Sequence, residues 1–257
     1  MKNVAVLGCG PTGLLVAHAV QQSGNCAHII SKKVKSEIPG SQHLHGSVPG
    51  LTSQYPEGTI QFVRLGTARE YARKVYGDPD RETGWNNYLQ VFPSWNVVKA
   101  YDRLWESWEG DISDMEVTVG LIPHILETYD LVISTIPAQV LCVNETHTFD
   151  GERYYIKKLP TPEADKEHEI VVYNGLPGDP WYRWSILGGL CSMESMDETL
   201  WTHPHNVNVI EGYKAIGNNC DCWPTIKRCG RWAEWRHGVI MYKSYLKAAD
   251  IMSRLEA

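Results

Sequence analysis

The chain has 257 residues, of which 43% are hydrophobic, so it is long enough to bury a core and longer than the usual single domain. A formal net charge of −6 argues against general nucleic-acid binding. Seven cysteines with no cleavable leader indicate free thiols, and no run reaches the roughly 18 apolar residues of a membrane span, so we expect a cytoplasmic protein without membrane contact.

The start of the chain predicts a βαβ unit. NVAVLG is typical of a short buried strand, a helix closed by Gly24 follows, and CAHIIS predicts a second strand. Between the first strand and the helix lies Gly8-x-Gly10-x-x-Gly13, in which the glycines permit a tight turn, close approach of a pyrophosphate and close helix packing. The helix N-terminus then offers N–H groups to phosphates. This segment predicts dinucleotide binding.

The second strand ends in Ser31-Lys32-Lys33, where the dinucleotide-binding pattern usually has an acid for the ribose. The lysines suit a 2′-phosphate, which would favour NADP. Alternatively, Ser31 contacts the ribose while the lysines face solvent or a phosphorylated substrate. Both interpretations stay open at this point.

Residues 50–110 are rich in turns and aromatic side chains, and we interpret them as an insertion on the substrate side. They contain a predicted helix closed by Gly77 and a second, YDRLWESWEGD, with Leu104, Trp105 and Trp108 facing inward. A further helix starts or kinks at Pro123.

Four later segments, ERYYIKKLP, HEIVVYNG, WYRWSIL and VNVIEGYKAIG, alternate as antiparallel strands do. Near the end, Gly230-Arg231 closes a predicted strand, and an amphipathic helix runs from about Gly238. A small sheet covering a cofactor is the natural interpretation of the four strands.

The GxGPxG turn, the loop IPGSQHLHG, the segment YDLVISTIP and the late Gly-Arg before a final helix together resemble FAD-dependent proteins of the amine-oxidase and UDP-galactopyranose-mutase branch. The resemblance implies an α/β fold: a Rossmann-like FAD-binding domain with a parallel sheet, plus a small antiparallel-sheet substrate region. The implied FAD-binding domain comprises residues 1–49, 111–150 and 203–257, and the interleaved substrate region comprises 50–110 and 151–202. The chain departs from the family in its short length and in the missing acid after strand two.

The resemblance also implies which residues contact FAD. In that branch the late Gly-Arg touches the ribityl chain and pyrophosphate, the final helix points toward the isoalloxazine, and a loop matching PGSQHL passes along the flavin. The predicted FAD-binding residues are Gly8, Gly10, Pro11, Thr12, Gly13, Ser31, Lys32, Lys33, Gly40, Ser41, Gln42, Thr135, Pro137, Gly230, Arg231, Gly238 and Val239.

Four residues are catalytic candidates. His43 and His45 flank the predicted flavin loop and suit a base or an electrophile, although hydrogen-bonded structural histidines are the alternative. Tyr182 and Arg183 match a segment that lies beside flavin and substrate phosphate in the mutases. Arg183 is either an anion clamp or a guanidinium packed among aromatic rings.

A metal site is not expected. Cys220, Cys222 and Cys229 with His203 and His205 suggest zinc, but structural zinc sites usually place at least two residues between paired cysteines. We therefore predict buried thiols, and the lack of a CxxC motif argues against a redox dithiol.

The predicted function is an FAD-dependent oxidoreductase that oxidises a carbon–nitrogen bond of an amine or amino-modified substrate. Short flavoproteins of this kind also occur in tailed-phage genomes beside DNA-base modification genes, which extends the expected substrates to nucleotides and DNA bases. The alternatives are a mutase-like flavin isomerase acting on a nucleotide sugar, and a flavin- or NADP-binding module without catalysis. The oligomeric state stays open.

Overall fold

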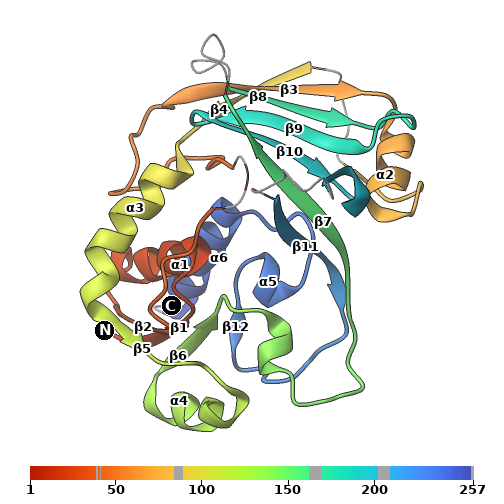
Figure 1. The fold of residues 1–257 in the computed structure, drawn as a ribbon. Helices are drawn as coiled ribbons and strands as arrows, with labels where there is room; N and C mark the ends of the chain where they lie inside the picture. Colours follow the sequence, from red (N-terminus) through yellow and green to blue (C-terminus); the bar gives the residue numbers. More distant parts are fainter. Residues whose placement is uncertain (39, 41, 84–88, 162–168, 202–208, 256–257) are drawn as a thin grey trace. The chain divides into compact units, whose positions relative to one another are not determined.

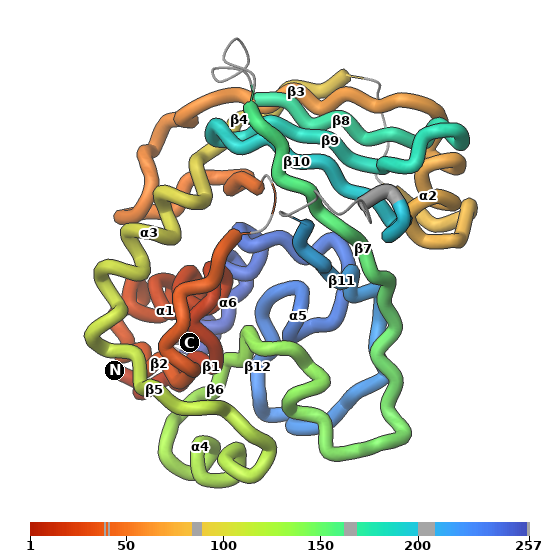
Figure 2. The backbone as a smooth tube through the Cα atoms, in the orientation of Figure 1, coloured from red at the N-terminus to blue at the C-terminus, as the bar shows by residue number. Residues whose placement is uncertain are grey.

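The computed structural model describes residues 1–38, 40, 42–83, 89–161, 169–201 and 209–255 (Figure 1). The chain forms two compact units: unit 1 contains residues 1–37, 99–151 and 215–257, and unit 2 contains residues 38–98 and 152–214. Figure 2 traces the backbone as it passes between them. Three of the boundaries predicted from the sequence, at 49, 110 and 202, lie about twelve residues from the corresponding limits of unit 2.

Unit 1 contains a five-stranded sheet of order β12-β6-β1-β2-β5, in which every neighbouring pair is parallel. Its strands are β1 (Asn3–Leu7), β2 (Cys26–Ser31), β5 (Ile112–Asp114), β6 (Leu131–Ser134) and β12 (Lys227–Arg228). Side chains Val4 to Leu7 of the central strand are completely buried, as expected for a parallel strand covered on both faces.

The helices of unit 1 lie around this sheet. They are α1 (Pro11–Gln22), α3 (Val97–Trp108, whose first two residues belong to unit 2), α4 (Ile122–Thr128), α5 (Arg231–Glu234) and α6 (Met241–Leu255). Short 3₁₀ turns occupy Glu109–Asp111, Val119–Leu121 and Ala138–Leu141. Helices α1 and α6 pack side by side, so the two ends of the chain share one layer (Figure 1).

Unit 2 is built on a seven-stranded sheet of order β11-β7-β10-β9-β8-β3-β4. Its strands are β3 (Gly58–Leu65), β4 (Leu89–Ser94), β7 (Phe149–Leu159), β8 (Glu169–Asn174), β9 (Trp181–Leu187), β10 (Leu190–Ser195) and β11 (Val209–Asn218). The pairing is mostly antiparallel, but β3 and β8 are parallel.

Helix α2 (Ala68–Tyr76) and a 3₁₀ turn (Glu198–Trp201) complete the described part of unit 2. Thr67 and Glu70 form a reciprocal capping box at the start of α2, and Gly77 ends it in the left-handed region with φ of 68°. The predicted stop at Gly77 is therefore confirmed, and its cause is a backbone conformation that glycine adopts without strain.

The predicted fold class, a parallel sheet with a second, mostly antiparallel sheet, is confirmed. The inward face of α3 is as predicted, with Leu104, Trp105 and Trp108 buried. Strands β3 and β4 were not predicted, and the final helix begins at Met241, after the short helix α5, rather than near Gly238. No helix in the described part of the chain combines the length and apolar character needed to span a bilayer.

Candidate functional site

The glycine turn of unit 1 has the backbone geometry that its sequence predicts. Gly8 has φ of +106°, and a Cβ there would lie 2.7 Å from Thr135 Oγ1. A Cβ on Gly13 would lie 2.0 Å from the Gly8 carbonyl oxygen. At Gly10, by contrast, the nearest atom to a Cβ is Ser36 Oγ at 3.9 Å. The first and third glycines are thus required by packing inside the protein, whereas Gly10 leaves room for an outside group to approach the backbone.

Helix α1 starts at this open position. Pro11 occupies its first turn, and Gly10 has no side chain with which to cap the N–H groups of Thr12 and Gly13. A twelve-residue helix with this start presents N–H donors and the positive end of its dipole to an anion. The arrangement fits the pyrophosphate of a dinucleotide.

The end of β2 and the segment after it carry Ser31, Lys32 and Lys33, which were predicted to lie near the ribose. Ser31 pairs with Asp114 of β5, and the Lys33 backbone N–H donates to Asp114 Oδ1 at 2.9 Å. Lys32 Nζ lies 2.8 Å from Glu116 Oε1, with both side chains exposed. Sequence reasoning found no acid at this edge, because Asp114 ends β5 and Glu116 follows it, more than eighty residues further along the chain. An exposed pair of this kind is weak, so Lys32 stays available to a phosphate.

Thr135 and Pro137 lie where β6 ends. Thr135 is fixed beside the glycine turn, because its N–H and its hydroxyl both donate to the Leu7 carbonyl oxygen, at 2.9 Å and 2.8 Å. Pro137 begins the 3₁₀ turn Ala138–Leu141. Ser134, the last residue of β6, is 1% exposed, and its hydroxyl has no hydrogen-bond partner within the described protein. This buried hydroxyl was not singled out from the sequence, because nothing local marks it.

The late Gly-Arg segment packs directly on the start of α1. Gly230 has φ of +101°, and a Cβ there would lie 2.7 Å from Thr12 Cγ2. Its N–H donates to Glu234 Oε1 at 3.2 Å, and that carboxylate also pairs with Lys247 of α6 at 3.1 Å. Residues more than 200 positions apart in the chain therefore meet at one edge of the sheet.

The other C-terminal candidates follow in order. Arg231 is the first residue of α5, and Gly238 and Val239 lie between α5 and α6. Gly238 has φ of +80° with nothing within 4 Å of its Cβ position, so a turn rather than close packing accounts for this glycine.

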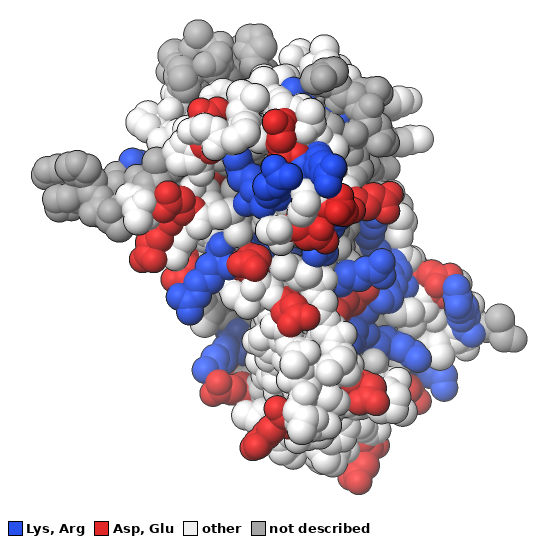
Figure 3. All heavy atoms as spheres, turned by 90° about the vertical axis from the view of Figure 1, so that its right-hand side faces the viewer, with Lys and Arg blue, Asp and Glu red and all other residues white. Residues whose placement is uncertain are grey.

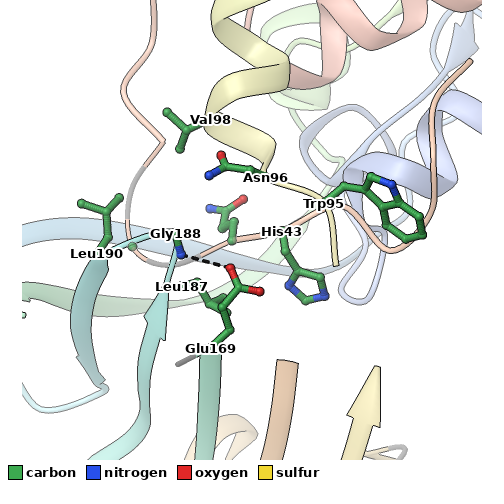
Figure 4. A pocket seen from close by; sticks show the side chains of 10 residues that line it. His43, Trp95, Asn96, Val98, Glu169, Leu187, Gly188 and Leu190 are labelled. Carbon is green, nitrogen blue, oxygen red and sulfur yellow. Dashed lines mark hydrogen bonds between the residues drawn. The ribbon is translucent and has the colours of Figure 1, made fainter. Parts of the chain in front are cut away.

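In unit 2, the predicted flavin loop lies against the seven-stranded sheet. Gly40 has φ of +68°, and its Cβ position is 3.4 Å from Glu194 Oε1. Gln42 and His43 line a small pocket, with space for about one water molecule, together with Trp95 and other residues of this unit (Figure 4). Ser41 lies outside the described residues.

His43 is held as a neutral imidazole. Burial, followed by the neighbouring His45 and Arg183, lowers the pKa of His43 to about 3. The His43 and His45 ring centroids are 4.0 Å apart, and His43 Nε2 is buried without a hydrogen-bond partner within the described protein. An imidazole with so low a pKa is a weak base, so His43 suits a neutral hydrogen-bonding role better than proton abstraction.

Arg183 and Tyr182 share one buried carboxylate. Arg183 of β9 pairs with Glu194 of β10, and both the Arg183 guanidinium and the Tyr182 hydroxyl donate to the Glu194 carboxylate. Glu194 is 2% exposed. The Lys214 ammonium lies 3.6 Å from the centroid of the Tyr182 ring. Neither residue was found from the sequence, since Glu194 reaches Arg183 only through strand pairing, and Lys214 reaches the Tyr182 ring from β11, which is not a neighbour of β9.

These contacts separate the two candidates. Tyr182 is 1% exposed and packs with Tyr71 and Val75, and burial raises the pKa of its phenol well above the ordinary value. Its hydroxyl therefore orients Glu194 rather than a substrate. The Arg183 side chain is 25% exposed, and its buried Nε has no partner within the described protein, so it retains a donor.

No family model and no curated protein matches this sequence. Solved structures do match its fold. Reduced UDP-galactopyranose mutase aligns with a TM-score of 0.58 at 12% identity, covering 100% of this chain and 94% of that one. A tetrameric 2-methyl-3-hydroxypyridine-5-carboxylic acid oxygenase aligns with a TM-score of 0.53 at 11% identity over 100% and 82% of the two chains.

A third structure, assigned as an FAD-containing monooxygenase from Photorhabdus luminescens subsp. laumondii, aligns with a TM-score of 0.50 at 9% identity, over 100% of this chain and 90% of that one. At these identities the matches concern the fold. This chain has the fold that a mutase, an oxygenase and an FAD-containing monooxygenase share.

Proposed function

We propose that this chain is an FAD-dependent oxidoreductase that oxidises a carbon–nitrogen bond of an amine. The observation that carries the proposal is the packing of Gly230 on Thr12, which brings the two ends of the predicted FAD motif to the same edge of the parallel sheet. The fold shared with an FAD-containing monooxygenase supports the same cofactor.

The residues at that edge fit FAD. Gly10 and the first turn of α1 would hold the pyrophosphate, since a Cβ at Gly10 would narrow the approach. Ser31 and Lys32 would lie on the adenosine side, and Arg231 on the ribityl side. When bound, FAD supplies a hydride acceptor, which this chain's own side chains lack.

The side chains of unit 2 would prepare the substrate. An amine gives up hydride only when its nitrogen lone pair is free, so an ammonium substrate must first lose a proton. Because a pKa of about 3 makes the His43 imidazole a very weak base, that proton would leave to solvent, and the neutral His43 Nε2 would orient the amine by accepting a hydrogen bond. Arg183, held by Glu194, would bind an anionic group of the substrate through guanidinium N–H groups that Glu194 does not take.

Charge favours a small substrate over duplex DNA. On the face drawn in Figure 3, Lys and Arg side chains lie among Asp and Glu side chains, and the chain's net charge is −6. A polyanion gains little from such a surface. Small amines are therefore the first substrates to test, followed by amino-modified nucleotides and DNA bases.

The direct test is anaerobic reduction. The FAD-loaded protein is mixed with a panel of amines and amino-modified nucleotides, and a substrate should bleach the flavin absorbance. A His43→Gln variant should keep its FAD but be reduced more slowly. If neither protein is bleached by any member of the panel, while dithionite bleaches both, carbon–nitrogen oxidation is excluded for those classes.

A second candidate is a flavin isomerase acting on a nucleotide sugar, favoured by the full-length match to UDP-galactopyranose mutase. It predicts turnover of a nucleotide sugar only after dithionite reduction, with no net consumption of oxidant. A module that binds cofactor without catalysis would show neither reaction.

A further inference from the structure

Four potential metal ligands of unit 1 meet outside the cofactor edge. The Sγ atoms of Cys142, Cys220 and Cys222 and a ring nitrogen of His147 all lie within 4.8 Å of one another. Cys142 follows the 3₁₀ turn Ala138–Leu141, whereas Cys220 and Cys222 precede β12. Two loops far apart in sequence thus contribute to one cluster.

The spacing of three of the four ligand atoms, those of Cys142, His147 and Cys222, is close to that of a tetrahedral zinc site. Zn–S bonds of about 2.3 Å and a Zn–N bond of about 2.0 Å at tetrahedral angles place ligand sulfurs about 3.8 Å apart and sulfur and nitrogen about 3.5 Å apart. Cys142 Sγ lies 3.9 Å from Cys222 Sγ, and His147 Nδ1 lies 3.3 Å and 3.6 Å from these two sulfurs. A disulfide needs sulfurs about 2.05 Å apart, so the geometry is not that of a disulfide.

We propose that Cys142, His147, Cys220 and Cys222 bind one structural zinc ion. Three cysteines and one histidine form an established structural ligand set that leaves no position open for a substrate. On binding, Zn²⁺ replaces three thiol protons, which leave to solvent, so that three thiolates and a neutral imidazole give a site of net charge −1.

Groups around the cluster suit that charge. Arg228 Nη2 donates to Cys220 Sγ at 3.3 Å and to the Cys222 carbonyl oxygen at 2.9 Å, which places a cation beside the thiolates. His147 Nε2 lies 3.5 Å from Asp221 Oδ1, a carboxylate that can accept the remaining imidazole proton.

The Asn144 amide nitrogen, 3.1 Å from His147 Nε2, fits the opposite tautomer. Metal binding at Nδ1 therefore moves the proton to Nε2 and transfers the hydrogen bond to Asp221.

This assignment replaces the expectation that the chain has no metal site. Cys229, which the sequence suggested as a possible zinc ligand, is not in the cluster. It is fully buried, and its backbone N–H donates to the Ser134 carbonyl oxygen. His203 and His205 lie outside the described residues. Cys142 and His147 were overlooked because more than seventy residues separate them from Cys220.

The metal would fasten the loop after β6 to the loop before β12. Those loops already meet through the Trp223 indole N–H, which donates to the Leu141 carbonyl oxygen at 2.8 Å. Since β12 leads directly to Gly230, the zinc ion would fix the entry to the late Gly-Arg segment.

The first test is metal content, which does not depend on flavin or activity. Protein produced with zinc in the medium should retain one zinc per chain after gel filtration, as measured by mass spectrometry of the elements. X-ray absorption should show three sulfurs at about 2.3 Å and one nitrogen at about 2.0 Å. Protein that neither retains zinc nor takes it up when zinc chloride is added under reducing conditions would overturn the proposal.

Variants separate metal binding from general packing. Cys222→Ser should weaken zinc affinity roughly 100-fold or more, and Asp221→Asn about 10-fold. His147→Cys should keep one zinc, now with four sulfurs, whereas a merely hydrogen-bonded histidine offers no reason for such retention. Cys26→Ser, which removes a half-buried thiol outside the cluster, is the matched control and should leave zinc content unchanged. Equal zinc affinity of Cys222→Ser and Cys26→Ser, measured by competition with a chelator, would contradict the assigned ligands even if both proteins fold.

Discussion

In unit 1 the candidate cofactor edge is shaped by backbone, whereas in unit 2 the candidate catalytic groups are held by buried charge. Gly8, Gly13 and Gly230 are glycines because a Cβ would meet a neighbouring atom at 2.7 Å or less. Arg183 instead takes its position from the Glu194 carboxylate one strand away. The comparison teaches that the first site can be identified from local sequence, while the second exists only once distant strands have paired.

The largest effect should come from breaking the charged cluster of unit 2. Glu194→Ala leaves the Arg183 guanidinium without its carboxylate, which costs about 3–5 kcal/mol in free energy of unfolding. Chemical denaturation monitored by circular dichroism measures this. Asp80→Ala, which removes the exposed partner of Arg69 in the same unit, should cost less than about 0.5 kcal/mol. Equal losses in the two variants would show that burial does not distinguish the pairs.

A substitution in the glycine turn of unit 1 should lower the free energy of unfolding slightly less than Glu194→Ala does, but it should also prevent FAD binding. A Cβ on Gly13 would lie 2.0 Å from a carbonyl oxygen, so Gly13→Ala should lose about 3 kcal/mol and most FAD affinity. Gly110→Ala, with nothing within 4 Å of its Cβ position, is the matched control in the same unit. FAD binding can be followed by flavin fluorescence. Undiminished FAD binding by Gly13→Ala would argue against this edge.

A smaller, pH-dependent effect should sharpen the description of unit 2. Burial first, then His45 and Arg183, lowers the pKa of His43 to about 3, below the ordinary value of 6.5 for the unfolded chain. Between those values the unfolded state takes up a proton that the folded state does not, so stability falls as pH falls. At pH 5 the loss is about 2 kcal/mol relative to pH 7. His43→Gln should lack this pH-dependent loss of stability. If denaturation curves show the same loss between pH 7 and pH 5 in both proteins, the low pKa of His43 is refuted.

The smallest effect should come from removing the N-terminal capping box of helix α2 in unit 2. Thr67→Ala removes the capping box of α2 and should cost about 1 kcal/mol. Thr118→Ala provides the comparison, since Thr118 begins a 3₁₀ turn without a side-chain hydrogen bond. Thermal denaturation of both variants should show a lower midpoint for Thr67→Ala alone. A matching decrease in Thr118→Ala would mean that the cap adds nothing.

The parts predicted from the sequence are those whose cause is local. The β1–α1–β2 unit follows from one strand, three glycines and a helix start, and the end of α2 follows from Gly77. Helix α3 was predicted because Leu104 and Trp108 repeat at helical spacing.

The parts that were missed depend on pairing between distant segments. Strand β4 exposes most of its side chains and contains Pro93, so it lacks the alternation that marks a strand, and pairing with β3 alone makes it one. Glu194 and Cys142 carry no local motif. Their partners come from β9 in the first case and from the loop before β12 in the second.

The measurement that tests the central claim most directly is the FAD content of the purified chain, taken from its visible spectrum and from cofactor released on denaturation. If the two ends of the chain build one cofactor edge, the protein should be yellow and hold one FAD per chain, and Arg231→Ala should hold less. A colourless chain that takes up no FAD on incubation, or an Arg231→Ala variant that stays fully loaded, would contradict the account.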